Sequence, residues 1–252
     1  MDPSHARRLW LVGEPVHAIT YFAQPSFDAW ASAGISGFWR GYFATRAAAF
    51  GAVGPELPTA SFYNFEPAMV ARALPAVWSM ASPERAVQAR LAGVDASLRA
   101  VLGDSVVDRP LGGTVAWLRR AVDACQSAGR PLFAAHAALD WPDAPHLAVW
   151  HGLTCLREHR GDGHNATLLA AGVDGCQAHV LAGAAGGTPR SVIQPTRGWS
   201  DEQWDAAREA LAVRGVQRHG GQRNEPAGEC PDVGAFHVVG GRFIRRPEID
   251  PP

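Results

Sequence analysis

The chain has 252 residues, of which 47% are hydrophobic and 19% are charged, and its formal net charge is −1. This length allows one large or two small domains with a sizeable core, and the composition is ordinary for a soluble globular protein. The neutral balance excludes a general electrostatic attraction to nucleic acid or anionic lipid, and no stretch approaches the roughly 18 apolar residues that a membrane-spanning helix needs.

The N-terminus lacks a basic segment followed by an apolar run, so we expect no signal peptide, a cytoplasmic location and no membrane partner. Four cysteines occur without CxxC spacing, namely Cys125, Cys155, Cys176 and Cys230. In a cytoplasmic chain this pattern predicts free, mostly buried thiols and no structural zinc site.

The N-terminal part of the sequence predicts short helices. Residues 5–25 carry apolar side chains at helical spacing around Pro15, which predicts two helices with a break at that proline. Aromatic residues recur every three or four positions between Phe27 and Phe50. Gly34 and Gly37 interrupt this pattern, so we expect one helix on each side of them.

The next segments differ in their local signals. Residues 57–65 are rich in aromatic and β-prone types between prolines, which predicts a short strand or an extended connection. Pro67 is typical of a first helical turn. Ser82 precedes a proline and an acidic residue, so we expect it to cap a helix that runs toward Leu102. A further amphipathic helix is predicted over residues 115–128.

The C-terminal half begins with a connection. Residues 129–145 contain three prolines, so only short helix is expected inside them. Helices are predicted over residues 173–185 and 201–214, the second with a capping box formed by Ser200 and a glutamine three residues later. Residues 236–244 predict a hairpin with a Gly-Gly turn.

Together these elements predict a mainly α-helical protein with little sheet. We expect two related helical units packed as one globule: an N-terminal unit over residues 1–128, a connection over 129–145 and a C-terminal unit over 146–252. A short repeat links the units, because Trp39 and Trp150 are each followed by a glycine two residues later and by an arginine seven residues later. This repeat indicates a tandem duplication.

The run from Trp150 to Asn165 gathers four charged residues and three histidines in an apolar neighbourhood, where polar groups are costly unless they are paired or used. Two interpretations stay open. In the first, Gly161 ends a helix and Asp162 caps the next one, which makes the run a helix-turn junction. In the second, the polar side chains form a site.

Five segments of the chain carry a family likeness: HAITYF (17–22), GFWRGYFATRAA (37–48), RALPAVW (72–78), WHGLTCLREHRGDGH (150–164) and RGWSDEQWDAA (197–207). Together they resemble an actinobacterial family of helix-turn-helix proteins, and LREHRGDGH is the most specific of them. The resemblance covers roughly residues 8–215. It implies a mostly helical protein with winged-helix-like units and carries over no catalytic residue.

The candidate site combines the central run with its counterpart in the N-terminal half. Four residues suit acid–base catalysis near neutral pH: Glu158, His159, His164 and His151. The candidate substrate-binding residues are Arg157, Arg46, Arg40, Tyr42, Tyr21, His17, Asn64 and Trp150. A bound metal is not expected, because two arginines stand beside the nitrogen and oxygen donors, and no cofactor motif is present.

The main functional hypothesis is an enzyme of cofactor-independent acid–base type. Its substrate would be an aromatic or hydrophobic small molecule of natural-product type, bound between the helical halves. One alternative is a protein that binds such a molecule without turnover, and another is a helix-turn-helix DNA-binding regulator. The helix expected to read DNA, residues 173–183, contains no arginine or lysine, so nucleic acid is not expected as a partner. A homodimer stays open.

Overall fold

The computed structural model describes residues 3–214, 236–239 and 242–245, and for the two short C-terminal segments it describes the backbone only. The helices in chain order are α1 (Pro3–Phe22), α2 (Gln24–Ser32), α3 (Phe38–Ala47), α4 (Glu56–Phe62), α5 (Pro67–Ala71), α6 (Pro83–Leu102), α7 (Asp104–Val107), α8 (Gly112–Asp123), α9 (Pro131–Ala137), α10 (Pro145–Ala170), α11 (Gly175–Ala184), α12 (Arg190–Arg197) and α13 (Asp201–Val213). Two 3₁₀ turns, η1 (Ala48–Phe50) and η2 (Ala76–Ser79), and two strands, β1 (Phe236–Val239) and β2 (Arg242–Arg245), complete the fold. The mainly α-helical prediction is confirmed.

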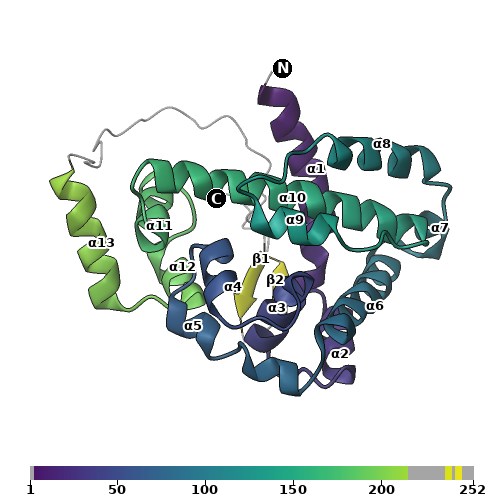
Figure 1. Ribbon diagram of the computed structural model, residues 1–252, viewed down its shortest axis with the longest axis horizontal. Coiled ribbons are helices and arrows are strands. Elements are labelled where there is room, and N and C mark those ends of the chain that lie inside the picture. Colours follow the sequence, from purple (N-terminus) through teal and green to yellow (C-terminus); the bar gives the residue numbers. More distant parts are fainter. Residues whose placement is uncertain (1–2, 215–235, 240–241, 246–252) are drawn as a thin grey trace, which may run out of the picture.

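The long helix α10 organises the molecule (Figure 1). It packs against α1, α8, α9 and α6 and leads into the C-terminal helices α11 to α13. Pro145 stands in its first turn, and Gly172, with a φ of 61°, follows its C-cap. Gly152 allows close packing in between, because a Cβ there would lie 2.9 Å from Leu118 and 3.0 Å from Trp141.

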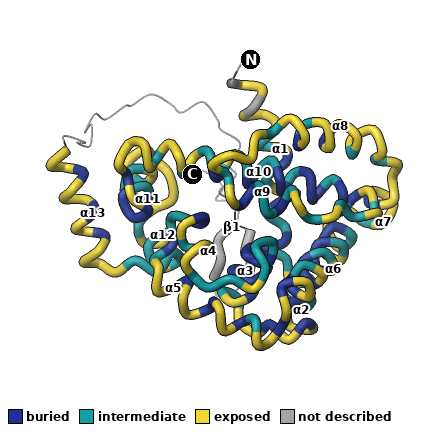
Figure 2. Tube along the Cα trace, in the orientation of Figure 1, coloured by how far each residue is buried: buried dark blue, intermediate teal, exposed yellow. Residues whose placement is uncertain are grey.

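The aromatic core lies beside this helix, between α2, α3, α4, α5 and α6, and burial is concentrated where these elements face one another (Figure 2). Trp30, Phe43 and Phe62 are its largest members. Gly41 lets α3 approach α2, because a Cβ at this position would lie 2.2 Å from the Trp30 ring. The predicted separation of these two helices by Gly34 and Gly37 is confirmed by their positive φ values of 91° and 87°.

Several local predictions are confirmed because the signals lie within a few residues. Ser82 accepts a hydrogen bond from the Arg85 amide and caps α6, and Ser200 forms the capping box of α13. A capping box at Asp174 starts α11 as well. The hairpin is also confirmed: β1 and β2 pair antiparallel, with Phe236 opposite Arg245, while the glycines of its turn lie outside the described residues.

Other local predictions are wrong. α1 continues through Pro15, which is exposed, while Gly13, His17 and Thr20 are buried on the packed face of this helix. A proline on the solvent side removes one backbone hydrogen bond whose carbonyl can bond to water instead. The predicted strand over residues 57–65 is helix α4, because its buried residues are spaced by three and four along the chain. α8 also ends earlier than predicted.

The helix-turn junction, the first of the two interpretations of Arg160 to Gly163, is absent, because α10 is continuous through Gly161 and Gly163. Asp162 does cap a helix, although a different one: its carboxylate accepts a hydrogen bond from the Phe133 amide in the first turn of α9, at 2.8 Å. This hydrogen bond therefore fixes α9 on α10. Among the described residues, no helix is both long enough and apolar enough to cross a membrane.

Candidate functional site

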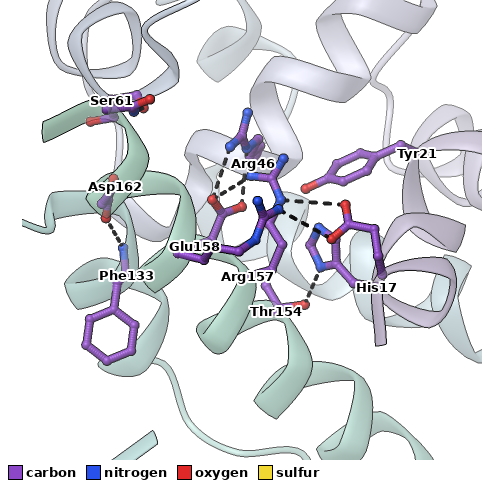
Figure 3. A network of polar contacts seen from close by, with 12 residues as sticks. His17, Tyr21, Arg46, Ser61, Phe133, Thr154, Arg157, Glu158 and Asp162 are labelled. Carbon is purple, nitrogen blue, oxygen red and sulfur yellow. Dashed lines mark hydrogen bonds and ion pairs between the residues drawn. The ribbon is translucent and has the colours of Figure 1, made fainter. Parts of the chain in front are cut away.

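The centre of the candidate site is the carboxylate of Glu158, which is fully buried on α10 (Figure 3). Arg46 of α3 donates to both of its oxygens, with Nε–Oε1 at 3.3 Å and Nη2–Oε2 at 3.0 Å. Nη1 of Arg157 donates to Oε2 at 2.8 Å. Burial alone would raise the pKa of Glu158, but the guanidinium groups of Arg157 and Arg46 outweigh it and hold this pKa well below its ordinary value. Glu158 is therefore an anion between two cations.

The two arginines of the Trp-Gly-Arg repeat thus meet at one carboxylate, although they lie on different helices. The tryptophans do not meet. Trp150 is buried beside α1, where its Nε1 donates to the His17 carbonyl at 3.2 Å, whereas Trp39 packs in the aromatic core. The repeat therefore supplies the two arginines that pair with Glu158.

A chain of polar aromatic groups extends from Arg46 into the protein. Arg46 Nη1 donates to the Tyr42 hydroxyl at 3.3 Å, and the rings of Tyr42 and Tyr21 lie with centroids 4.9 Å apart. Arg90 Nη2 donates to the Tyr21 hydroxyl at 2.7 Å and its guanidinium also lies 4.9 Å from the Trp150 ring centroid. These groups hold Arg46 in place from the side opposite Glu158.

A cavity of about 140 Å³ opens next to Glu158, between α3, α4, α10 and the end of α12. Its lining is Tyr42, Arg46, Ser61, Phe62, Asn64, Phe65, Arg157, Glu158, Arg160, Gly161, Asp162, His164, Asn165 and Arg197. Four guanidinium groups against two carboxylates leave a formal excess of two positive charges. The lining therefore suits an anion.

Three buried polar atoms of this lining have no hydrogen-bond partner: Ser61 Oγ, Arg157 Nε and Arg197 Nε. Arg197 lies over the Phe65 ring at 4.7 Å and forms no salt bridge with a carboxylate of the described residues. Burial lowers its pKa, and the neighbouring Arg46 and Arg157 lower it further against the opposing effect of Tyr42. A cation that is largely removed from water without a carboxylate partner is costly, which is a further reason why this lining suits an anion.

One wall of the cavity includes Asn64 and Phe65. The segment around them, residues 63–66, is hydrogen-bonded to the C-terminal helices. The Asn64 carbonyl accepts hydrogen bonds from His179 Nε2 of α11 at 3.0 Å and from Trp199 Nε1 at 3.1 Å. The Glu66 amide donates to the Arg197 carbonyl at 2.8 Å. Tyr63, at a φ of 62°, donates its hydroxyl to the backbone just before α11. A change at the cavity therefore reaches α11 and α12 directly.

The structure brings about half of the predicted site residues to this cavity: Tyr42, Arg46, Asn64, Arg157, Glu158 and His164. Of the predicted catalytic set, His151 instead packs against Trp141 with centroids 5.1 Å apart, and His159 packs against Phe133 at 5.0 Å. Arg40 is exposed. Of the three predicted catalytic histidines, only His164 therefore shares the cavity with Glu158.

The remaining predicted residues, Tyr21, His17 and Trp150, are buried behind the cavity and do not line it. His17 Nδ1 shares a hydrogen bond with Thr154 Oγ1 at 3.0 Å. Sequence reasoning missed Ser61, Asn165 and Arg197, although Arg197 opens one of the segments that carry the family resemblance. Ser61 and Arg197 lie far from Glu158 along the chain, and no local pattern marks Asn165, which lies seven residues after Glu158 on α10.

A larger hollow of about 810 Å³ lies between α11 and α13, but both of its arginines are paired. Arg190 lies 2.7 Å from Asp201 and 3.0 Å from Asp205, and Arg208 lies 3.7 Å from Asp205. Within residues 3–214, no cluster of three or more His, Cys, Asp or Glu side chains is placed to hold a metal ion.

Comparison with known proteins gives one result. The sequence model of a helix-turn-helix family matches residues 6–230. No curated protein and no solved structure matches the chain. The family match overturns the expectation that nucleic acid is not a partner, because that expectation was drawn from the lack of arginine on a single helix and from the neutral net charge. The match spans most of the sequence, and the chain therefore belongs to this helix-turn-helix family.

Proposed function

We propose that the protein is a ligand-responsive regulator, which binds a small organic anion in the arginine-lined cavity and duplex DNA through its helix-turn-helix elements. The observation that supports an anionic ligand is the formal excess of two positive charges in the cavity lining. The family supports the DNA-binding part. A carboxylate is the favoured anionic group, because a planar guanidinium can donate two parallel hydrogen bonds to it.

The cavity offers the groups that such an anion needs. Arg197 Nε is an unpartnered donor, and Ser61 adds an unpartnered hydroxyl. Asn165 is already engaged, since its side-chain amide donates to the Ser61 carbonyl at 2.9 Å and fixes α10 against α4. An incoming carboxylate therefore finds preorganised donors that no protein group has to vacate.

Coupling to DNA follows from the position of Arg197. Its side chain lines the cavity, and its backbone belongs to the last turn of α12. A ligand that binds Arg197 favours those arrangements of α12 and α11 that keep the cavity closed. Such a ligand shifts DNA affinity only to the extent that it binds the DNA-competent and DNA-free arrangements differently.

This proposal retains the small organic ligand expected from the sequence and omits the acid–base step. Glu158 is held ionised by two guanidinium groups, and His151 and His159 lie away from the cavity. A carboxylate with a strongly lowered pKa is a poor proton carrier near neutral pH. The two-unit organisation over residues 1–128 and 146–252 is part of the proposal, and it accounts for the pair of arginines that meet at Glu158.

Isothermal titration calorimetry with acetate, succinate and inorganic phosphate tests the cavity. We expect at least one of these anions to bind, and Arg197→Met to weaken its binding by about tenfold or more, since a charge-assisted pair is lost. Arg72→Met is the matched control, because Arg72 is exposed and lies outside the cavity. The proposal fails if none of the anions binds, or if both variants bind equally well.

A further inference from the structure

A second cavity, of about 240 Å³, lies along α10 on the side that faces α1 and α8. Its apolar lining consists of Leu9, Trp10, Trp117, Leu118, Leu153 and Leu156. Leu9 is 60% exposed and Trp117 is 47% exposed at its rim. Large apolar side chains around a concave surface mark a place where apolar material binds.

The two cavities share Arg157 and Arg160, which line both. Arg157 donates through Nη1 to Glu158 on the polar side, while its Nε faces Glu14 of α1 at 3.9 Å on the apolar side. Arg160 Nη2 lies 3.7 Å from Glu14, and its guanidinium lies 5.5 Å from the Trp10 ring centroid. Two guanidinium groups therefore stand in the lining of the apolar cavity.

Glu14 forms an ion pair with each of these guanidinium groups but accepts a hydrogen bond from neither. Its distances to Arg157 and Arg160 exceed hydrogen-bonding length, and its Oε2 already accepts a hydrogen bond from Trp10 Nε1 at 3.0 Å. One carboxylate thus stands against two guanidinium groups in this cavity. His17 also lines it, but burial and then Arg157 lower the pKa of His17, so its imidazole adds no charge near neutral pH.

We propose that the ligand is amphipathic: an organic carboxylate whose anionic group binds Arg157 and Arg160 and whose apolar chain or ring occupies the cavity between α1, α8 and α10. This inference rests on the proposed function for the anion and adds the chemical class of the rest of the molecule. Arg157 and Arg160 are the reason to place the charge and the apolar body in one ligand, since these two residues line both cavities.

The test is a calorimetric series of acetate, butanoate, hexanoate and octanoate at constant ionic strength. Each methylene that enters the apolar cavity should strengthen binding by about fourfold. The double variant Leu9→Gln with Trp117→Gln should weaken octanoate binding and leave acetate unchanged. Both residues are exposed at the rim, so the fold does not depend on them. The matched control is Leu169→Gln, because Leu169 is a similarly exposed leucine that lies on α10 outside both cavities.

Octylammonium, with the same chain and the opposite charge, provides the second control and should not bind. Octylammonium binding as strong as that of octanoate would overturn the inference, because the cavity would then select only for apolar character. Binding of short anions without any gain along the series would overturn it as well, while leaving the proposed function intact. If no anion binds at all, both proposals fail.

Discussion

At the scale of single residues, the molecule is organised by buried charge. Glu158 is surrounded by Arg46 and Arg157 at hydrogen-bonding distance, and Arg90 is buried nearby without a carboxylate partner among the described residues. Removing one member of a buried ion pair leaves the other uncompensated, which costs more than the pair itself contributes. Loss of the Glu158 carboxylate is therefore expected to lower the free energy of unfolding strongly.

Replacing Glu158 by glutamine should lower the free energy of unfolding by about 3–5 kcal/mol, because Arg46 and Arg157 would keep their charges and lose their counter-ion. Chemical denaturation of the purified variant measures this change. Glu209→Gln, on the exposed face of α13, should change stability by about 0.5 kcal/mol or less. A loss below about 1 kcal/mol for Glu158→Gln would show that these guanidinium groups find other partners.

A second residue-scale prediction concerns pH and His136, which is buried on α9. Burial and then Arg90 lower its pKa from 6.5 to about 3. The unfolded chain therefore takes up a proton near pH 6.5 that the folded chain refuses, so stability is full above pH 6.5 and falls as the pH decreases toward 3. His151, with a pKa lowered to about 4, acts in the same direction.

Urea denaturation at pH 7, 6 and 5 measures this dependence. Each such histidine should contribute a slope approaching about 1.4 kcal/mol per pH unit below its unfolded pKa. In His136→Phe the decrease between pH 6 and 5 should be smaller than in the wild type. An equal decrease in both proteins would show that His136 is protonated in the folded state.

At the scale of elements, the continuity of α10 is the main departure from expectation. Gly161 has helical neighbours on both sides, and a Cβ at this position would meet its nearest side-chain atoms at 3.7 Å, an ordinary contact distance. An alanine should therefore fit. The change Gly161→Ala should stabilise the protein by about 0.5–1 kcal/mol through its effect on backbone entropy.

Gly172→Ala is the contrasting variant, because Gly172 has a φ of 61° after the end of α10 and should resist a side chain. Thermal and chemical denaturation of both variants give the comparison. Destabilisation by Gly161→Ala would indicate a turn at this position in place of a helix.

The elements also show which sequence signals predict structure. Caps at Ser82 and Ser200 and the glycines before α3 act within a few residues, so the sequence alone was enough to predict them. The helix through Pro15 and the helix α4 depend on which face is buried, and that is decided by distant parts of the chain. Propensity alone was therefore misleading at both places.

The residues of the candidate site also fall into two groups: those that a local sequence pattern marks and those that only the packing of the chain brings together. Arg46, Arg157 and Glu158 were found because the repeat and the concentration of charge mark them in the sequence. Arg197 and Ser61 carry no such local mark, and they join the site only through the packing of α4 and α12 on α10. The role of Asp162 was also assigned to the wrong helix, since its partner Phe133 lies 29 residues earlier in the sequence.

At the scale of the whole molecule, a near-neutral net charge provides no general attraction to DNA, so the proposed DNA binding has to depend on a local face of the helix-turn-helix elements. Arg190 is paired with Asp201 and Asp205, and Arg197 faces the cavity. Few free cations are therefore left on α12. In the proposed function, a ligand that binds Arg197 therefore determines how α12 and α11 are positioned.

The most direct test of this account is a titration of duplex DNA in the presence and absence of ligand. A duplex selected by the protein from a random library would be titrated alone and with a saturating concentration of the tightest anion from the calorimetric series. The account predicts that the ligand changes the dissociation constant by about tenfold or more, a coupling of about 1.4 kcal/mol, and that Arg197→Met removes the change. Failure to select any duplex, or equal dissociation constants with and without the anion, would contradict it.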